Sequence, residues 1–136
     1  MKIVITNINK RTLDLANFLS NESDKNEVIL LSEKKEYLIK NLENNIKIFN
    51  VKNDIISTLI NLDFDNEDII ICNFTNNYEN NIVAQSIIAS EKNIKVYLLV
   101  SDDSLFDLYK SNENITVINI NKVINNLLIK TISQEQ

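Results

Sequence analysis

Glycine, proline, histidine and tryptophan are absent from this chain of 136 residues, and cysteine occurs once. Without histidine, the chain lacks the commonest metal ligand and the side chain that most often serves as a general acid or base. A single cysteine cannot form an internal disulfide, and Cys72 lies in an apolar run, which favours a buried and unreactive thiol. We therefore expect neither a metal centre nor an enzyme.

The lack of glycine also restricts the turns. Asparagine is the residue other than glycine that best tolerates left-handed backbone, and it is one of the two commonest residues here, together with isoleucine. A genome-wide bias toward isoleucine, asparagine and lysine would explain the composition equally well. In either case, we expect asparagine to occupy turns that glycine usually forms.

Charge and hydropathy exclude further classes. The net charge is -5, whereas a nucleic-acid partner would favour a basic surface. The opening residues MKIVITN turn polar too early for a signal peptide, and the longest uncharged apolar run, IIICNF, is too short to span a bilayer. We expect a cytoplasmic protein that binds no nucleic acid and does not insert directly into a membrane.

Short apolar runs alternate with segments of helical periodicity along the chain. The runs predict six buried strands: Lys2–Ile5, Val28–Leu31, Ile46–Phe49, Ile69–Phe74, Lys95–Val100 and Ile115–Ile118. Helical spacing follows each run, around Leu13–Leu19, Tyr37–Leu42, Ile55–Leu62, Tyr78–Ala89, Leu105–Tyr109 and Val123–Thr131. This alternation predicts a Rossmann-like α/β fold, a doubly wound six-stranded parallel sheet with helices on both faces. We expect one domain over residues 1–132 and a frayed polar tail over residues 133–136.

Side chains that favour helix N-caps precede several of the predicted helices. The candidate caps are Asn9, Ser32, Asn53, Asn121 and either Ser101 or Asp102. Four carboxylates also cluster between the third helix and the fourth strand, at Asp63, Asp65, Glu67 and Asp68. This stretch lacks the turn glycine of a calcium loop, so a solvated connection is favoured over a metal site.

In a parallel sheet of this kind, ligands bind beyond the carboxyl ends of the strands. In dinucleotide-binding proteins, three glycines after the first strand give a tight turn, close approach to the pyrophosphate and close helix packing. Asn7, Asn9 and Thr12 stand at the corresponding places, and their side chains would fill that space. Lys10 and Arg11 could instead hold a phosphate there, although solvated charges on the helix are the simpler interpretation.

The other strand ends give a mixed picture. The second strand of a dinucleotide site usually ends in an acid that binds the ribose hydroxyls. Here Ser32 stands at that place and Glu33 comes one residue later. The third strand ends at Asn50 and the fourth ends near Thr75.

Four segments together resemble one known family. MKIVITNINKRTLDLANFL resembles the opening of the TrkA N-terminal domain, also called the RCK or KTN domain, in which a strand is followed by G-x-G-x-x-G and then by x-x-L-A. FTNNYENNIVAQ resembles its V-T-x-D-D-x-x-N-L-x-A segment, VSDDSLFDLY its R-D-P-x-Y-x-x-L-L segment, and ITVINI its closing D-x-V-I-x-P. The matching residues include Leu15, Ala16, Thr75, Asn81, Ala84, Asp102 and Leu108.

The resemblance implies a domain that regulates potassium channels or transporters, pairs into dimers and often forms a ring beneath a membrane pore. It also implies a pocket for NAD(H) or for ATP and ADP. The glycines of the phosphate turn map to Asn7, Asn9 and Thr12. The ribose acid maps to Ser32 and the acid after the third strand to Asn50, while the threonine after the fourth strand is retained as Thr75.

These substitutions lead us to expect a regulatory or assembly subunit of a potassium uptake or channel system, with a degenerate nucleotide pocket and no bound cofactor. It would form a homodimer or a larger ring and contact a membrane transporter or channel subunit at the inner face of the membrane. Apolar residues of the last two helices could belong either to the core or to that interface: Leu105, Phe106, Tyr109, Ile120, Val123 and Ile124.

Other functions remain as alternatives. A functional domain that senses NAD(H) or ATP/ADP would use Lys10 and Arg11 for the phosphates. A small NAD-dependent oxidoreductase is disfavoured, because the chain has no Tyr-x-x-x-Lys pair and no substrate domain. A phosphoacceptor receiver domain is excluded, because the acid pair after the first strand and the aspartate after the third are missing.

Overall fold

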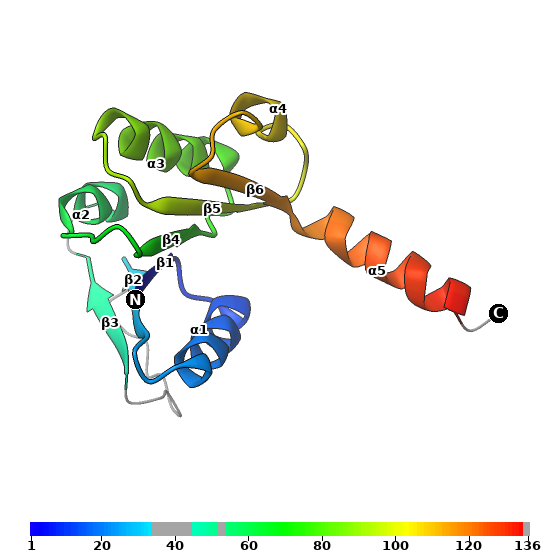
Figure 1. Ribbon diagram of the computed structural model, residues 1–136, viewed down its shortest axis with the longest axis horizontal. Coiled ribbons are helices and arrows are strands. Elements are labelled where there is room, and N and C mark those ends of the chain that lie inside the picture. Colours follow the sequence, from blue (N-terminus) through cyan, green and yellow to red (C-terminus); the bar gives the residue numbers. More distant parts are fainter. Residues whose placement is uncertain (34–44, 52–53, 135–136) are drawn as a thin grey trace.

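The computed structural model describes residues 1–33, 45–51 and 54–134, which form one parallel sheet of six strands in the order β3-β2-β1-β4-β5-β6 (Figure 1). The strands are β1 (Lys2–Thr6), β2 (Glu27–Ser32), β3 (Ile46–Asn50), β4 (Ile69–Cys72), β5 (Lys95–Val100) and β6 (Ile115–Asn119). The helices of the described residues are α1 (Lys10–Glu22), α2 (Ile55–Asn61), α3 (Asn77–Ala89), α4 (Phe106–Tyr109) and α5 (Ile120–Gln134). The predicted Rossmann-like α/β fold is confirmed.

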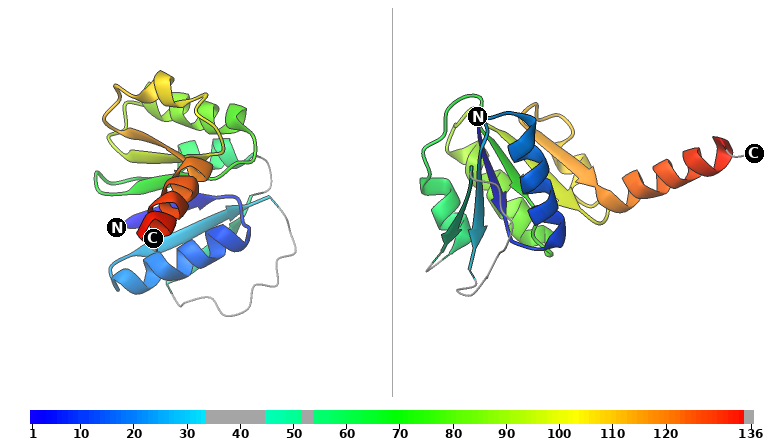
Figure 2. Two further views of the ribbon diagram at one scale, coloured as in Figure 1. Left: turned by 90° about the vertical axis from the view of Figure 1, so that its right-hand side faces the viewer. Right: turned by 90° about the horizontal axis from the view of Figure 1, so that it is seen from below.

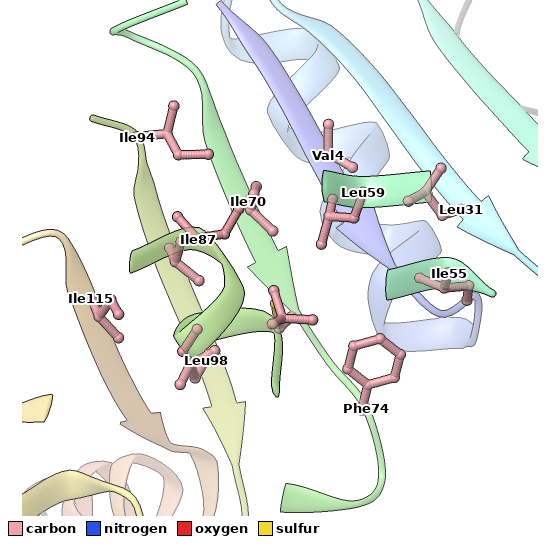
Figure 3. Packing of buried hydrophobic residues seen from close by; sticks show 14 of the residues in the cluster. Val4, Leu31, Ile55, Leu59, Ile70, Phe74, Ile87, Ile94, Leu98 and Ile115 are labelled. Carbon is pink, nitrogen blue, oxygen red and sulfur yellow. The ribbon is translucent and has the colours of Figure 1, made fainter. Parts of the chain in front are cut away.

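Helices cover the two faces of the sheet unequally. Helices α2 and α3 lie on one face, and α1 lies on the other, where it packs mainly on β2 and β3 (Figures 1 and 2). Successive strand residues point to opposite faces, so both faces of the central strands are apolar. Val4, Leu31 and Ile70 pack under α2 and α3 (Figure 3), while Ile3 and Leu30 face α1.

The predicted elements lie where the sequence places them, with differences at their ends. Strand β4 ends at Cys72, two residues before the predicted end, because Asn73 N–H donates to Thr6 Oγ1 and Phe74 N–H donates to Asn80 Oδ1. The helix predicted around Tyr37–Leu42 lies outside the described residues. Helix α5 continues to Gln134, into the segment predicted to be a frayed tail.

The predicted helix caps are confirmed only in part. Asn9 caps α1 as predicted. The prediction that Asn53 caps α2 was wrong. Asp54 is the N-cap of α2, and its side chain accepts a hydrogen bond from Ile56 N–H. Ser32 is the last residue of β2, and Asn121 lies inside α5. Helix α4 has Leu105 as its N-cap, with no side-chain bond, so neither Ser101 nor Asp102 caps it.

The side chains of Cys72 and Asp68 are both buried. Cys72 is fully buried, and the loss of solvation raises the pKa of its thiol far above the usual value. Asp68 is also buried, contrary to the predicted solvated connection. Its carboxylate accepts hydrogen bonds from Lys2 N–H at 2.7 Å and from Asp65 N–H at 2.8 Å, so it ties the connection to β1.

Candidate functional site

A cavity of about 710 Å³ opens beyond the carboxyl ends of β1, β4 and β5. The strand order reverses between β1 and β4, which is where parallel sheets of this kind place their ligands. Residues at or just beyond the ends of the three strands line the cavity: Asn9–Arg11, Asn73–Asn77 and Leu99–Asp102. The sequence predicts site residues at the first turn and at the ends of the second, third and fourth strands. The cavity lies at the first turn and the end of the fourth strand, and it also includes the end of the fifth strand, which the sequence did not predict.

Asn7 forms the turn that a glycine usually forms. Its φ is 66°, in the left-handed region, and its N–H donates to Leu31 O at 3.2 Å. Its side-chain Nδ2 donates to Asn73 O at 3.3 Å, which braces the turn against the end of β4. Asparagine therefore reproduces the turn conformation, but it adds a side chain beside the helix entrance.

Asn9 and Thr12 close the first turn of α1 upon itself. Asn9 Oδ1 accepts Thr12 N–H at 3.0 Å, and Thr12 Oγ1 accepts Asn9 N–H at 2.8 Å, which is a reciprocal capping box. The carbonyl oxygen of Asn9 accepts Leu13 N–H at 3.0 Å. A diphosphate at a Rossmann turn depends on free N–H groups at this end of the helix. The Asn9 amide oxygen now occupies one of those positions.

Lys10 and Arg11 both line the cavity, on the wall formed by α1. Arg11 Nη1 reaches Asn73 Oδ1 at 3.5 Å, across the cavity floor. Within the described part of the chain, neither cation forms an ion pair with a carboxylate. Both positive charges are thus available at the cavity wall.

The residues predicted to contact a ribose lie around a second, smaller cavity of about 240 Å³, between β1, β2 and α2. Ser32 lines it but is buried, and its carbonyl accepts Val51 N–H at 2.7 Å. Glu33 Oε1 accepts Ile55 N–H at 3.4 Å, at the first residue of α2. Glu33, the acid predicted nearest to the ribose position, therefore contacts the protein itself.

The last two predicted site residues, Thr75 and Asn50, lie in different places. Thr75 lines both cavities. Asn50 is exposed at the end of β3 and lines neither of these two cavities. Of the predicted site residues, Asn9, Lys10, Arg11 and Thr75 thus line the larger cavity together, whereas Asn50 lies apart from both cavities.

Sequence reasoning missed several lining residues, notably Asn73, Asn77 and Ser101. They follow β4 and β5, whose carboxyl ends lie at the same edge of the sheet as that of β1. The rule that ligands bind at this edge could have predicted them from the sequence. On the β5 wall, hydrogen bonds from Ser104 and then from Asn77 hold the pKa of Asp102 below its usual value. Asn77 Nδ2 donates to Asp102 Oδ1 at 3.1 Å.

A second feature is the pair of apolar surfaces without a partner near the C-terminus. Helix α5 projects from the body of the domain (Figure 1), and none of its residues is buried. Its exposed large apolar residues are Val123, Ile124, Leu127, Leu128, Ile129 and Ile132. By contrast, Leu105 and Tyr109 belong to the core. The apolar residues near the last two helices are therefore divided between the core and the exposed surface.

The α1 side of the sheet is incompletely covered over β5 and β6. Tyr97 and Leu99 of β5 point to this side and are only half-buried. Ile118 of β6 pairs with Leu99 in the parallel register, so it shares that side, and it is also half-buried. We call Tyr97, Leu99 and Ile118 the open sheet face.

Comparison with known proteins adds no assignment, because neither a protein-family model nor a curated protein matches this chain. None of the described helices combines the length and apolar content that crossing a membrane requires. Over the same residues, no group of three or more aspartate, glutamate or cysteine side chains is placed to hold a metal ion.

Proposed function

We propose that this chain is a homodimeric regulatory or assembly subunit of a potassium uptake or channel system, with a nucleotide pocket that has lost its usual ligand. The observation that carries the proposal is helix α5, which presents an apolar face to solvent beside an open sheet face. The resemblance to the TrkA N-terminal domain supplies the link to potassium transport.

The energetics of α5 support the proposed dimer. An isolated helix of this length is marginal in water, and tertiary packing of an apolar face normally stabilises it. Each aliphatic side chain that leaves water contributes about 1.5–3 kcal/mol. Leu127 and Leu128 are 63% and 54% exposed, so a large part of that contribution is still unrealised.

A second copy is the occupant that matches α5 best. The helix contains Lys122 and Lys130 and no acidic residue, whereas the chain as a whole is acidic. Each copy also offers an open sheet face, on the side where a doubly wound fold places a helix after its last strand. Reciprocal packing of each α5 on the open sheet face of the other copy buries both apolar surfaces in a closed two-fold dimer.

The residues that match the family support the scaffold. Ala16 of α1 and Ala84 of α3 are fully buried at helix–sheet contacts. Asn81 accepts a hydrogen bond from the Tyr109 hydroxyl, which joins α3 to α4. These positions fit a Rossmann-like domain of the TrkA N-terminal type.

The contacts at the first turn argue against a dinucleotide. The Asn9 side chain occupies the helix end, and Glu33 binds α2 instead of a ribose. A functional sensor of NAD(H) or ATP/ADP is the second candidate, because Lys10 and Arg11 do line the larger cavity. Binding of these nucleotides that depends on both cations would favour the second candidate.

The partner is tested by affinity capture from solubilised membranes with the tagged wild-type chain. The proposal expects a potassium channel or transporter subunit to be captured and identified by mass spectrometry. The matched control is the tagged Leu127→Asp chain, which should capture less if the dimer is the binding form. Capture of the chain's own untagged copy, with no potassium-transport protein, would contradict the transport role and leave the dimer intact.

A further inference from the structure

The cavity beyond β1, β4 and β5 carries opposite charges on opposite walls. Lys10 and Arg11 lie on the α1 wall and Asp102 lies on the β5 wall, with amide and hydroxyl side chains between them. We propose that this cavity binds a sugar monophosphate, with the phosphate at the two cations and the sugar hydroxyls toward Asp102. The inference rests on the proposed loss of dinucleotide binding, since it assigns a smaller ligand to the same edge of the sheet.

The phosphate end is defined by charge. The two cations are adjacent in the first turn of α1, which contains no acidic residue, so the positive end of the helix dipole adds to them. A phosphate monoester carries close to two negative charges at neutral pH and accepts several charge-assisted hydrogen bonds. Lys10 and Arg11 together match that charge.

The opposite wall suits hydroxyl groups. Asp102 is exposed and lines the cavity, and an exposed aspartate is ionised at neutral pH. A carboxylate accepts hydrogen bonds from hydroxyls. The amide oxygens of Asn73 and Asn76 already accept hydrogen bonds from Arg11 and from Tyr78 N–H, so these two side chains offer their Nδ2 groups as donors. The same negative charge repels a second phosphate, so the cavity selects a ligand that is phosphorylated at one end only.

The cavity floor is held in place before any ligand arrives. Asn80 is fully buried and bonds the backbone of Phe74 twice, as acceptor at 3.2 Å and as donor at 3.3 Å. Thr6 Oγ1 accepts Asn73 N–H at 3.0 Å. Fixed walls reduce the ordering cost of binding. The volume of about 710 Å³ is within the usual range for a small organic ligand.

The test is isothermal titration of the full chain with ribose 5-phosphate, and with ribose, inorganic phosphate and NADH as separate probes. We expect saturable binding of ribose 5-phosphate, weaker binding of inorganic phosphate, and none of ribose or NADH. Replacing both Lys10 and Arg11 by alanine should weaken binding of ribose 5-phosphate by roughly 100-fold, because two charge-assisted contacts are lost.

Two further variants separate recognition from structure. Lys25→Ala with Lys95→Ala removes the same charge from sites outside the cavity and should bind as the wild type does. Asp102→Asn should weaken binding of ribose 5-phosphate by about tenfold while leaving that of inorganic phosphate unchanged or stronger, because the amide removes a repulsive charge. Circular dichroism and light scattering confirm that each variant is folded and keeps the oligomeric state of the wild type.

The outcomes distinguish the inference from the proposal on which it rests. No binding of ribose 5-phosphate at millimolar concentration, or equal binding by the variant without Lys10 and Arg11, overturns the sugar-phosphate site alone. Binding of NADH more tightly than ribose 5-phosphate overturns the loss of dinucleotide binding, and with it the preference for a single phosphate.

Discussion

At the scale of the residue, asparagine occupies a turn position that Rossmann-like proteins usually give to glycine, and it also caps a helix and bonds a loop. Asn7 adopts the left-handed turn, Asn9 caps α1, and Asn80 bonds the backbone after β4. Turn conformation needs only a residue that tolerates positive φ, which asparagine does. Close approach of a ligand needs bare backbone, which asparagine cannot supply. The turn therefore forms without glycine, and the Asn9 side chain caps the helix end at which a Rossmann turn usually binds a diphosphate.

The backbone at Asn7 gives a direct test of this account. Asn7→Ala and Asn7→Gly both lose the hydrogen bond to Asn73 O, but only alanine must hold a φ of 66° with a Cβ atom. We expect the alanine variant to be less stable than the glycine variant by about 1 kcal/mol, measured by urea unfolding. The control pair at Asn21, an exposed position in α1, should show the reverse order, because alanine is the better helix former. The same order at both sites would be inconsistent with a left-handed turn at Asn7.

At the scale of the element, α1 and α5 show how differently two amphipathic helices can be used. Helix α1 buries Thr12, Ala16 and Ser20 against the sheet. Helix α5 is longer, carries more large apolar side chains and buries none of its residues. Its base is fixed to the loop after β5, where Asn121 Nδ2 donates to Ser101 O at 3.1 Å and Lys122 pairs with Asp103 at 3.8 Å. The helix is thus held at its first turn and lacks packing along its length.

A charge placed on the apolar face of α5 should separate the copies. Leu127→Asp puts a carboxylate among the exposed apolar residues, whereas Asn125→Asp adds the same charge at an exposed position already occupied by a polar residue. Sedimentation velocity should give a monomer for the first variant and a dimer for the second at the same concentration, because a buried unpaired charge is costly. A dimer that survives Leu127→Asp would place the interface elsewhere on the molecule.

The sequence predicts elements better than their surroundings. The strands are predictable because the apolar runs are short and rich in β-branched isoleucine and valine, which favours a buried strand over a buried helix. Periodicity does not separate Leu105 and Tyr109, which are core, from Phe106 and Val123, which are exposed, since both groups have the same apolar character. The cavity walls depend on which strand ends are neighbours, and strand order is a property of the whole sheet. Asp68 was misjudged for a similar reason, because its hydrogen-bond partner on β1 is distant in the sequence.

At the scale of the whole molecule, the structure contains two separate surface features, a polar cavity and a projecting apolar helix. The carboxyl edge of the sheet carries the polar cavity between β1, β4 and β5, and the end of β6 leads into the projecting helix α5 (Figure 2). The loop after β5 lies between them, because Ser101 and Asp102 line the cavity while Asp103 pairs with Lys122. The loop after β5 therefore contacts both the cavity and the first turn of α5.

Nucleotide binding is tested on the intact chain by thermal unfolding. A ligand present at a hundred times its Kd stabilises a folded protein by about 2.7 kcal/mol, which is readily seen as a rise in Tm. We expect no rise with NADH, ATP or ADP, because Asn9 occupies the helix end and Glu33 is bound to α2. A rise that disappears when Lys10 and Arg11 are replaced by alanine would support the sensor instead.

The central claim is that α5 requires a second copy of the chain. Light scattering coupled to size-exclusion chromatography measures this without any variant or ligand. We expect a mass of twice 15.7 kDa that persists on dilution into the low micromolar range. A mass of 15.7 kDa at high protein concentration would contradict it, because α5 would then have no second copy to pack against.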